Sequence, residues 1–105
     1  KLTPEEAIRL IHICGGAAVL AHPGLLPDRS YLEPLLELNW QGMEIYHPDH
    51  SQKIKSMLKD IAQRKKLICT GGSDFHGNKS SRRKLGACTV DESIVERLRE
   101  SCPKP

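Results

Sequence analysis

Three short, mainly apolar runs alternate with helical segments along the chain, and this alternation constrains the fold more than any other feature. The runs cover residues 17–21, 42–46 and 67–70, and glycine or proline follows each of them closely. Short continuous apolar segments bounded by turn residues are typical of strands buried on both faces. Since helices are predicted before, between and after these strands, the order favours an α/β fold with a parallel sheet or barrel.

The helices are predicted from capping signals and periodicity. The first starts at Thr3, with Pro4 at the first helical position and Glu6 completing a capping box, and it stops at Gly15. The second covers about 31–38. The third starts near Ser51, and its apolar side chains repeat at helical spacing: Ile54, Met57, Leu58, Ile61 and Ala62.

The C-terminal third of the chain is predicted to be more irregular. A polar, basic loop covers about residues 77–84, and residues 85–90 form a short strand. Asp91 then caps a last helix that carries Ile94, Val95 and Leu98.

Composition limits the classes of protein to consider. A chain of 105 residues fits one domain, and a net charge of +3 favours anionic ligands only slightly. No apolar run approaches the roughly 20 residues that span a bilayer, and no signal peptide is present, so no membrane partner is expected. Four cysteines without a Cys-x-x-Cys pair indicate reduced thiols in a cytoplasmic protein. The start at Lys1, directly on a helix, indicates a fragment or a trimmed chain.

Potential metal ligands follow each predicted strand. They are His22 after the first strand, His47, Asp49 and His50 after the second, and Asp74 and His76 after the third. The carboxyl ends of parallel strands meet on one face, so these side chains are expected on one rim. Imidazole and carboxylate together suit Zn, Mn or Fe, which can polarise a phosphoryl oxygen and activate water.

These residues also have structural interpretations. One histidine at a strand end is more often a hydrogen-bonded structural residue than a ligand, but agreement at three strand ends favours a metal site of His22, Asp74 and His76. His12 lies inside the first helix and stays outside this set. Ser73 has no adjacent base, so no covalent nucleophile is expected.

Three motifs occur in order: residues 21–24 (Ala-His-Pro-Gly), 42–48 (Gly-Met-Glu-Ile-Tyr-His-Pro) and 71–77 (Gly-Gly-Ser-Asp-Phe-His-Gly). Together they resemble the later motifs of the PHP (polymerase and histidinol phosphatase) family of metal-dependent phosphoesterases, in particular its small phosphatases acting on nucleotide-like phosphates. The resemblance covers nearly the whole chain, and Ser-Asp-Phe-His is its most specific part.

The resemblance implies that residues 1–105 form the C-terminal portion of a distorted (β/α)7 barrel with a cluster of two or three divalent metal ions. It implies that His22, Asp74 and His76 are metal ligands and that Asp74 and His76 take part in catalysis. The family's opening His-x-His motif and its middle ligands are absent from this sequence. Catalysis by this chain alone is therefore not expected.

Several side chains have two open interpretations. Glu44 either orients a ligand histidine or forms a structural salt bridge. His47 and His50 either donate to substrate phosphate or lie in a solvated loop. A basic run beside the Asp74 motif either binds phosphate, with Arg82 and Arg83 as the main contacts, or is solvated; it comprises Lys79, Arg82, Arg83 and Lys84.

The sequence therefore predicts hydrolysis of phosphate esters, on a nucleotide-like or other phosphorylated small molecule, by the complete protein. One alternative is an exonuclease-like module that processes or binds nucleic acid, although no aromatic residue lies within the basic run. The other is a non-catalytic domain retained for assembly. A truncated barrel is also expected to oligomerise through its open sheet edges.

Overall fold

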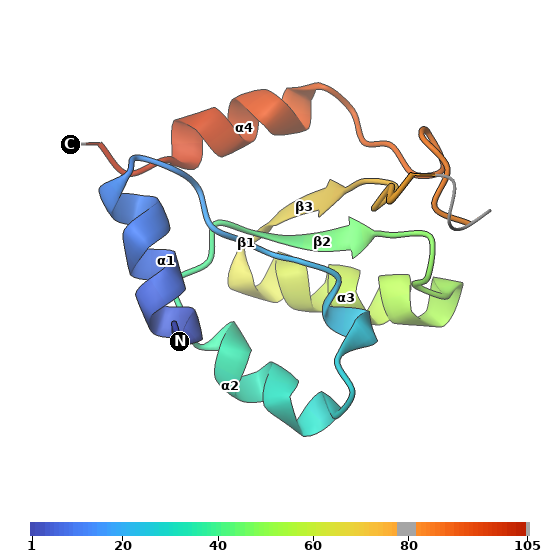
Figure 1. Ribbon diagram of the computed structural model, residues 1–105, viewed down its shortest axis with the longest axis horizontal. Helices are drawn as coiled ribbons and strands as arrows, with labels where there is room; N and C mark the ends of the chain where they lie inside the picture. Colours follow the sequence, from blue (N-terminus) through green and yellow to red (C-terminus); the bar gives the residue numbers. More distant parts are fainter. Residues whose placement is uncertain (78–81, 105) are drawn as a thin grey trace.

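A three-stranded parallel sheet organises the computed structural model, which describes residues 1–77 and 82–104 (Figure 1). Its strands lie in the order β1-β2-β3 and comprise Val19–Leu20, Gly42–Tyr46 and Ile68–Gly71. Val19 lies opposite Gly42, which in turn lies opposite Ile68, so the three strands run side by side in one direction. The predicted α/β fold with a parallel sheet is confirmed.

Helices precede or follow each strand, as predicted. They are α1 (Pro4–Ile13), α2 (Leu32–Leu36), α3 (Gln52–Lys65) and α4 (Ser93–Ser101), with short 3-10 turns at Pro23–Leu25 and Arg29–Tyr31. The capping box of α1 is present: the Glu6 backbone N–H donates to Thr3 Oγ1 at 3.2 Å, and the Glu6 carboxylate accepts from the Thr3 N–H. Ser51 caps α3 through the Ile54 N–H at 3.2 Å.

The core lies between β2 and the helices α2 and α3. Met43 and Ile45 of β2 are fully buried and pack with α3 and α2 through Leu58, Ala62, Leu32 and Leu36. The side chains of Met43 and Ile45 share one face of the sheet because they are two residues apart, which places Glu44 on the opposite face. The packing of α3 through its apolar stripe confirms the predicted helical periodicity.

Three boundary predictions are wrong. Residues 85–90 form turns and coil instead of a strand; Gly86 has a φ of 80°, which turns the chain, and Leu85 is 74% exposed. The first strand is shorter than residues 17–21, and it is half-buried because it pairs only with β2 in the part of the chain that is described. Asp91 lies one residue before the N-cap of α4, where its carboxylate accepts from the Ser93 N–H at 3.4 Å.

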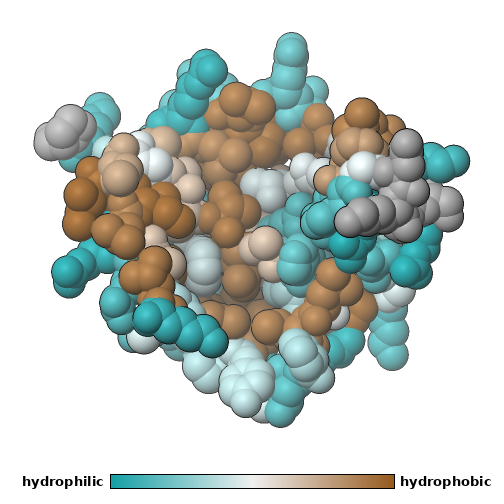
Figure 2. Space-filling view, viewed as in Figure 1, coloured by the Kyte–Doolittle hydropathy of each residue, from teal (hydrophilic) through white to brown (hydrophobic). Residues whose placement is uncertain are grey.

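Apolar surface remains uncovered in the described structure. Figure 2 shows brown apolar surface in the middle of the face seen in Figure 1, ringed by polar side chains. Ile13 is 70% exposed and Val95 is 52% exposed. No helix among residues 1–77 and 82–104 is long and apolar enough to cross a membrane.

We expect this chain on its own to self-associate or to be only marginally stable. Strands β1 and β3 are the outer strands of the described sheet, and unpaired strand edges beside exposed apolar side chains favour association. Light scattering during a dilution series, followed by thermal unfolding, measures both properties. A monodisperse monomer with a high melting temperature would contradict this expectation.

Candidate metal and phosphate site

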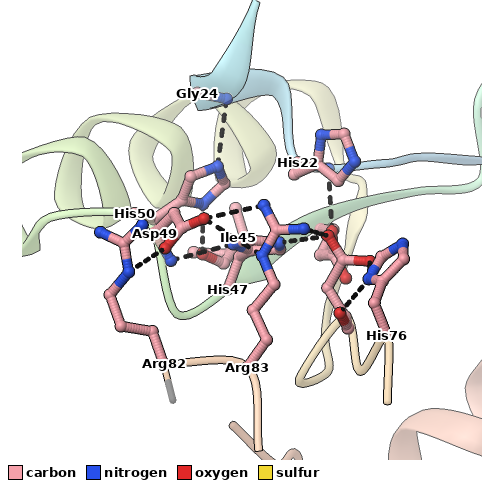
Figure 3. Close-up of polar contacts among 11 residues, drawn as sticks. His22, Gly24, Ile45, His47, Asp49, His50, His76, Arg82 and Arg83 are labelled. Carbon is pink, nitrogen blue, oxygen red and sulfur yellow. Dashed lines mark hydrogen bonds and ion pairs between the residues drawn. The ribbon is translucent and has the colours of Figure 1, made fainter. Parts of the chain in front are cut away.

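The predicted site residues gather where the three strands end (Figure 3). His22 follows β1, His47 follows β2 and Asp74 follows β3. The His22 and His47 ring centroids are 5.3 Å apart, and His47 Nε2 lies 2.9 Å from Asp74 Oδ2. The prediction that three strand ends bring these side chains to one edge of the sheet is confirmed.

His22 is held by its backbone. It has a φ of 25°, in the left-handed region that non-glycine residues rarely adopt, and its N–H donates to Glu44 Oε1 at 2.9 Å. Glu44 thus contacts the main chain of the predicted ligand and not its ring. This contact orients the turn that carries His22, and a role of Glu44 in positioning a ligand histidine stays a prediction.

Asp74 has the same unusual backbone, with a φ of 54°. Among the described residues, His22, Lys66 and Asp74 are the three non-glycine residues with positive φ, and Lys66 simply ends α3. Strained main-chain conformations persist where surrounding contacts enforce them, and they cluster at functional sites. The positive φ values at His22 and Asp74 thus coincide with two of the strand ends that carry predicted ligands.

His47 is fully buried beneath this edge. Its Nδ1 accepts from the Asp49 N–H at 3.0 Å, so the ring proton lies on Nε2 and is donated to Asp74 Oδ2 at 2.9 Å. Both ring nitrogens are occupied by protein atoms. The interpretation of His47 as a solvated loop residue is wrong. The predicted hydrogen bond from His47 to substrate phosphate is also not possible in this arrangement, because neither ring nitrogen is free.

His50 is also buried and takes part in a second internal pair of hydrogen bonds. Its Nε2 accepts from the Gly24 N–H at 3.1 Å, and its Nδ1–H donates to the Ile45 carbonyl at 2.8 Å. A Cβ atom on Gly24 would lie 2.7 Å from the His50 ring, so only glycine allows this approach. His50 joins the turn after β1 to the end of β2, and a solvated rim position is again wrong.

The two predicted phosphate-binding arginines differ in their surroundings. Arg83 is 26% exposed, and its Nε and one terminal nitrogen donate to Asp49 Oδ2 at 3.2 and 2.8 Å. Its other terminal nitrogen lies 3.2 Å from Asp74 Oδ2. Arg82 is 75% exposed and lies 3.4 Å from Asp49 Oδ1. Lys84 is exposed, and Lys79 lies outside the described residues.

The electrostatics keep both aspartates ionised at neutral pH. The pKa of Asp74 is lowered mainly by the hydrogen bond from His47, with contributions from the charge of Arg83 and the neighbouring His76. The pKa of Asp49 is lowered mainly by the hydrogen bond from Arg83. The same pairing raises the pKa of Arg83. Asp74 is therefore available as an anionic ligand at neutral pH.

His76 lies beside Asp74 but points outward, and it is 60% exposed. Its Nδ1 lies 2.6 Å from the Asp74 carbonyl oxygen, which fixes the proton on Nδ1 and leaves Nε2 with a lone pair. A neutral imidazole with one free nitrogen is the form that binds metal. The position of His76 is thus compatible with its predicted role as a ligand.

The described side chains fit part of a metal site. Their chemistry suits a divalent ion, since His22, Asp74 and His76 offer two imidazoles and one carboxylate. However, no group of three or more His, Cys, Asp or Glu side chains in residues 1–77 and 82–104 is placed to hold a metal ion. Further donors would have to complete the coordination.

The ion pair between Asp49 and Arg83 was not predicted from the sequence. Asp49 was expected on the same rim, but nothing in its Pro-Asp-His context indicated a partner 34 residues away. The one available signal was its place directly after a strand end that also carries His47. The pairing joins residues 34 positions apart, which no local pattern specifies.

The geometry defines a class of protein: α/β proteins in which aspartate and histidine side chains gather at the carboxyl ends of parallel strands. No family model matches the chain. It is 44% identical over 73 residues to phosphoribosyl 1,2-cyclic phosphate 1,2-diphosphodiesterase of Eggerthella lenta, covering 70% of this chain and 28% of the relative. It is 37% identical over 79 residues to the 5′-3′ exoribonuclease Rnm of Escherichia coli, covering 70% and 27%.

A third relative is the 3′,5′-nucleoside bisphosphate phosphatase of Chromobacterium violaceum, with 33% identity over 87 residues, or 78% of this chain and 30% of the relative. The chain thus spans less than a third of the length of these curated relatives.

Two solved structures share the fold. A candidate metal-dependent phosphoesterase from Bifidobacterium adolescentis matches with a TM-score of 0.79 and 28% identity over 91% of this chain and 35% of its own. An amidohydrolase from Chromobacterium violaceum, solved with bound sulfate and no metal, matches with a TM-score of 0.75 and 29% identity over 95% and 37%. These relatives and solved structures confirm the resemblance to the PHP family of phosphoesterases that the motifs indicated.

Proposed function

We propose that the complete protein is a metal-dependent phosphoesterase that hydrolyses nucleotide-like phosphate esters, and that residues 1–105 form the C-terminal portion of its PHP domain. The observation that carries the proposal is the ionised Asp74 carboxylate, held between His47 and Arg83 at the strand ends of a chain 44% identical to a phosphodiesterase. By itself this chain is inactive because its donors make only part of a metal site.

Each side chain has a separate task in this proposal. His22, Asp74 and His76 hold metal, and Asp74 and His76 are the catalytic ligands. Two or three divalent ions of Zn, Mn or Fe, when bound, supply Lewis-acid stabilisation of the phosphate and activation of the attacking water. Glu44 fixes the backbone of His22 through the 2.9 Å hydrogen bond.

Arg82 is the phosphate-binding arginine in this scheme. Its guanidinium is 75% exposed beside the site, whereas Arg83 uses all its nitrogens on Asp49 and Asp74. An exposed guanidinium can pair with two phosphate oxygens at once. The sequence-based prediction that both arginines bind substrate is therefore narrowed to Arg82.

A second candidate substrate is a short RNA. The 37% identity to an exoribonuclease favours it, and a phosphodiester backbone presents the same anionic group to Arg82. The two candidates differ in salt dependence, since contacts to several phosphates make binding fall steeply with added salt.

The test is hydrolysis with Mn by the complete protein of three substrates in parallel: phosphate release from a nucleoside bisphosphate, ring opening of a cyclic phosphodiester to a monoester, and release of mononucleotides from a short 5′-phosphorylated RNA. We expect turnover of at least one substrate by the complete protein and none by this chain alone. Absence of turnover of all three by the metal-loaded complete protein would refute the proposal.

Replacing Arg82 with glutamine in the complete protein should raise KM about tenfold and leave kcat within about twofold, because the lost contact binds ground and transition states alike. Lys84→Gln is the matched control: it removes one positive charge from the same exposed loop. We expect no comparable change in KM for the control. Equal effects of the two substitutions would show that Arg82 acts only through bulk charge.

A further inference from the structure

We propose that Asp49 is a positioning residue that orients the carboxylate of Asp74. It does so by holding the side chains of His47 and Arg83 against one of the two carboxylate oxygens of Asp74. This inference rests on the proposed function, since it assigns the remaining oxygen of Asp74 to metal binding. Asp49 touches neither metal nor substrate in this scheme and acts through its two partners.

Asp49 contacts both partners with separate groups. Its backbone N–H donates to His47 Nδ1 at 3.0 Å, which fixes the proton of His47 on Nε2. Its carboxylate accepts two hydrogen bonds from Arg83 at one oxygen, at 3.2 and 2.8 Å. Figure 3 shows His47 and Arg83 converging beside Asp49 from opposite segments of the chain. One residue thus sets the tautomer of the histidine and the orientation of the guanidinium.

His47 and Arg83 then meet at the same atom of Asp74. His47 Nε2 lies 2.9 Å from Asp74 Oδ2, and Arg83 lies 3.2 Å from this same oxygen. The other oxygen, Oδ1, lies on the side of His76, 3.4 Å from its Nδ1. Two donors on one oxygen restrict rotation of the carboxylate, so Oδ1 keeps its direction toward His76, one of the two other predicted ligands.

Burial makes this arrangement selective. His47 is fully buried, and the Asp49 side chain is only 13% exposed. Asp49 Oδ1 is buried without a hydrogen-bond donor in the described structure, with Arg82 3.4 Å away as its ion-pair partner. Charge-assisted hydrogen bonds are stronger when shielded from water, and partners behind a metal ligand fix its orientation. Burying a carboxylate with one oxygen lacking a hydrogen-bond donor contributes little to the stability of the fold, and this favours the positioning role of Asp49.

The first measurement is Mn affinity and turnover of the complete protein carrying Asp49→Asn. Asparagine keeps the backbone N–H to His47 and the side-chain shape, but removes the charge that holds Arg83. We expect Mn affinity and kcat each to fall about tenfold, with KM for substrate within about twofold. Asp60→Asn on the exposed surface of α3 is the matched control and should change neither quantity.

The second measurement is a double-mutant cycle between Asp49→Asn and Arg83→Gln. If Asp49 acts through Arg83, the double variant is no worse than Arg83→Gln alone, whereas independent structural roles give additive losses. Thermal unfolding of each variant separates misfolding from mispositioning, and Arg83→Lys replaces Asp49→Asn if the latter does not fold. Lysine keeps the charge but cannot bridge two carboxylates, so we expect the same loss of Mn affinity.

These readouts distinguish the inference from the proposed function. Weaker Mn binding by folded Asp49→Asn, in a complete protein that hydrolyses none of the three substrates, would support the positioning role and refute the phosphoesterase activity. Unchanged Mn affinity and kcat in folded Asp49→Asn would overturn the positioning role, as would additive losses in the cycle.

Discussion

Replacing Asp74 with alanine is expected to abolish phosphate release by the complete protein, with kcat/KM falling about a thousandfold or more. The substitution removes a metal-ligand carboxylate at the end of β3. It also leaves His47 Nε2–H and one Arg83 nitrogen without the acceptor that lies 2.9 and 3.2 Å away. An unpartnered buried donor and a released guanidinium would further disturb the site.

Asp74→Asn separates these two effects. The amide keeps an oxygen that can accept from His47, so we expect the variant to fold and to keep the His47 hydrogen bond, yet to lose activity with the ligand charge. Phosphate release with Mn and thermal unfolding are measured side by side, with Asp60→Ala as the exposed control. Equal activity of the parent, Asp74→Ala and Asp74→Asn would mean that this site is not the catalyst.

The second large effect is on stability: His50→Ala should lower the free energy of unfolding by about 3 kcal/mol. Alanine leaves a cavity beneath the site and deprives the Gly24 N–H and the Ile45 carbonyl of their partners, at 3.1 and 2.8 Å. Loosening this link would also free the turn that carries His22. Chemical denaturation of this chain, or of the complete protein if the chain does not unfold reversibly, measures the change.

His50→Asn tests the two hydrogen bonds separately. The asparagine NH2 group can replace the imidazole Nδ1–H as donor to Ile45, but no atom replaces Nε2 as acceptor for Gly24. We therefore expect about half of the loss seen with alanine. Lys53→Ala, an exposed change nearby on α3, should stay within about 0.5 kcal/mol. If His50→Ala were as mild as Lys53→Ala, the structural role of His50 would be wrong.

Features that depend on neighbouring residues were predictable from the sequence. The capping box at Thr3 and Glu6 forms because its donors and acceptors lie within one turn. The burial of Leu58 and Ala62 follows from their helical spacing. The meeting of His22, His47 and Asp74 follows from a topological rule, since parallel strands bring their carboxyl ends to one edge.

Features that depend on residues far apart were not predictable. Arg82 and Arg83 are adjacent and chemically identical in sequence, but Arg83 lies between two aspartates, whereas Arg82 is 75% exposed and pairs with Asp49 alone. Residues 85–90, where a strand was expected, turn at Gly86 and pair with no strand of the described sheet, although Val90 lies beside Gly71 of β3. Strand formation requires a partner, which local propensity does not specify.

By itself, the sequence determined which residue types follow each strand, and hence that imidazoles and carboxylates share one edge of a parallel sheet. Only the tertiary structure decided what each of them does there. His47 and His50 were expected at the rim, yet both are buried, and Gly24, Ile45, Asp49 and Asp74 occupy all four ring nitrogens. The physical reason is that hydrogen-bond partners separated by 26 and 27 residues are chosen by the packing of turns against one another, which no local pattern encodes.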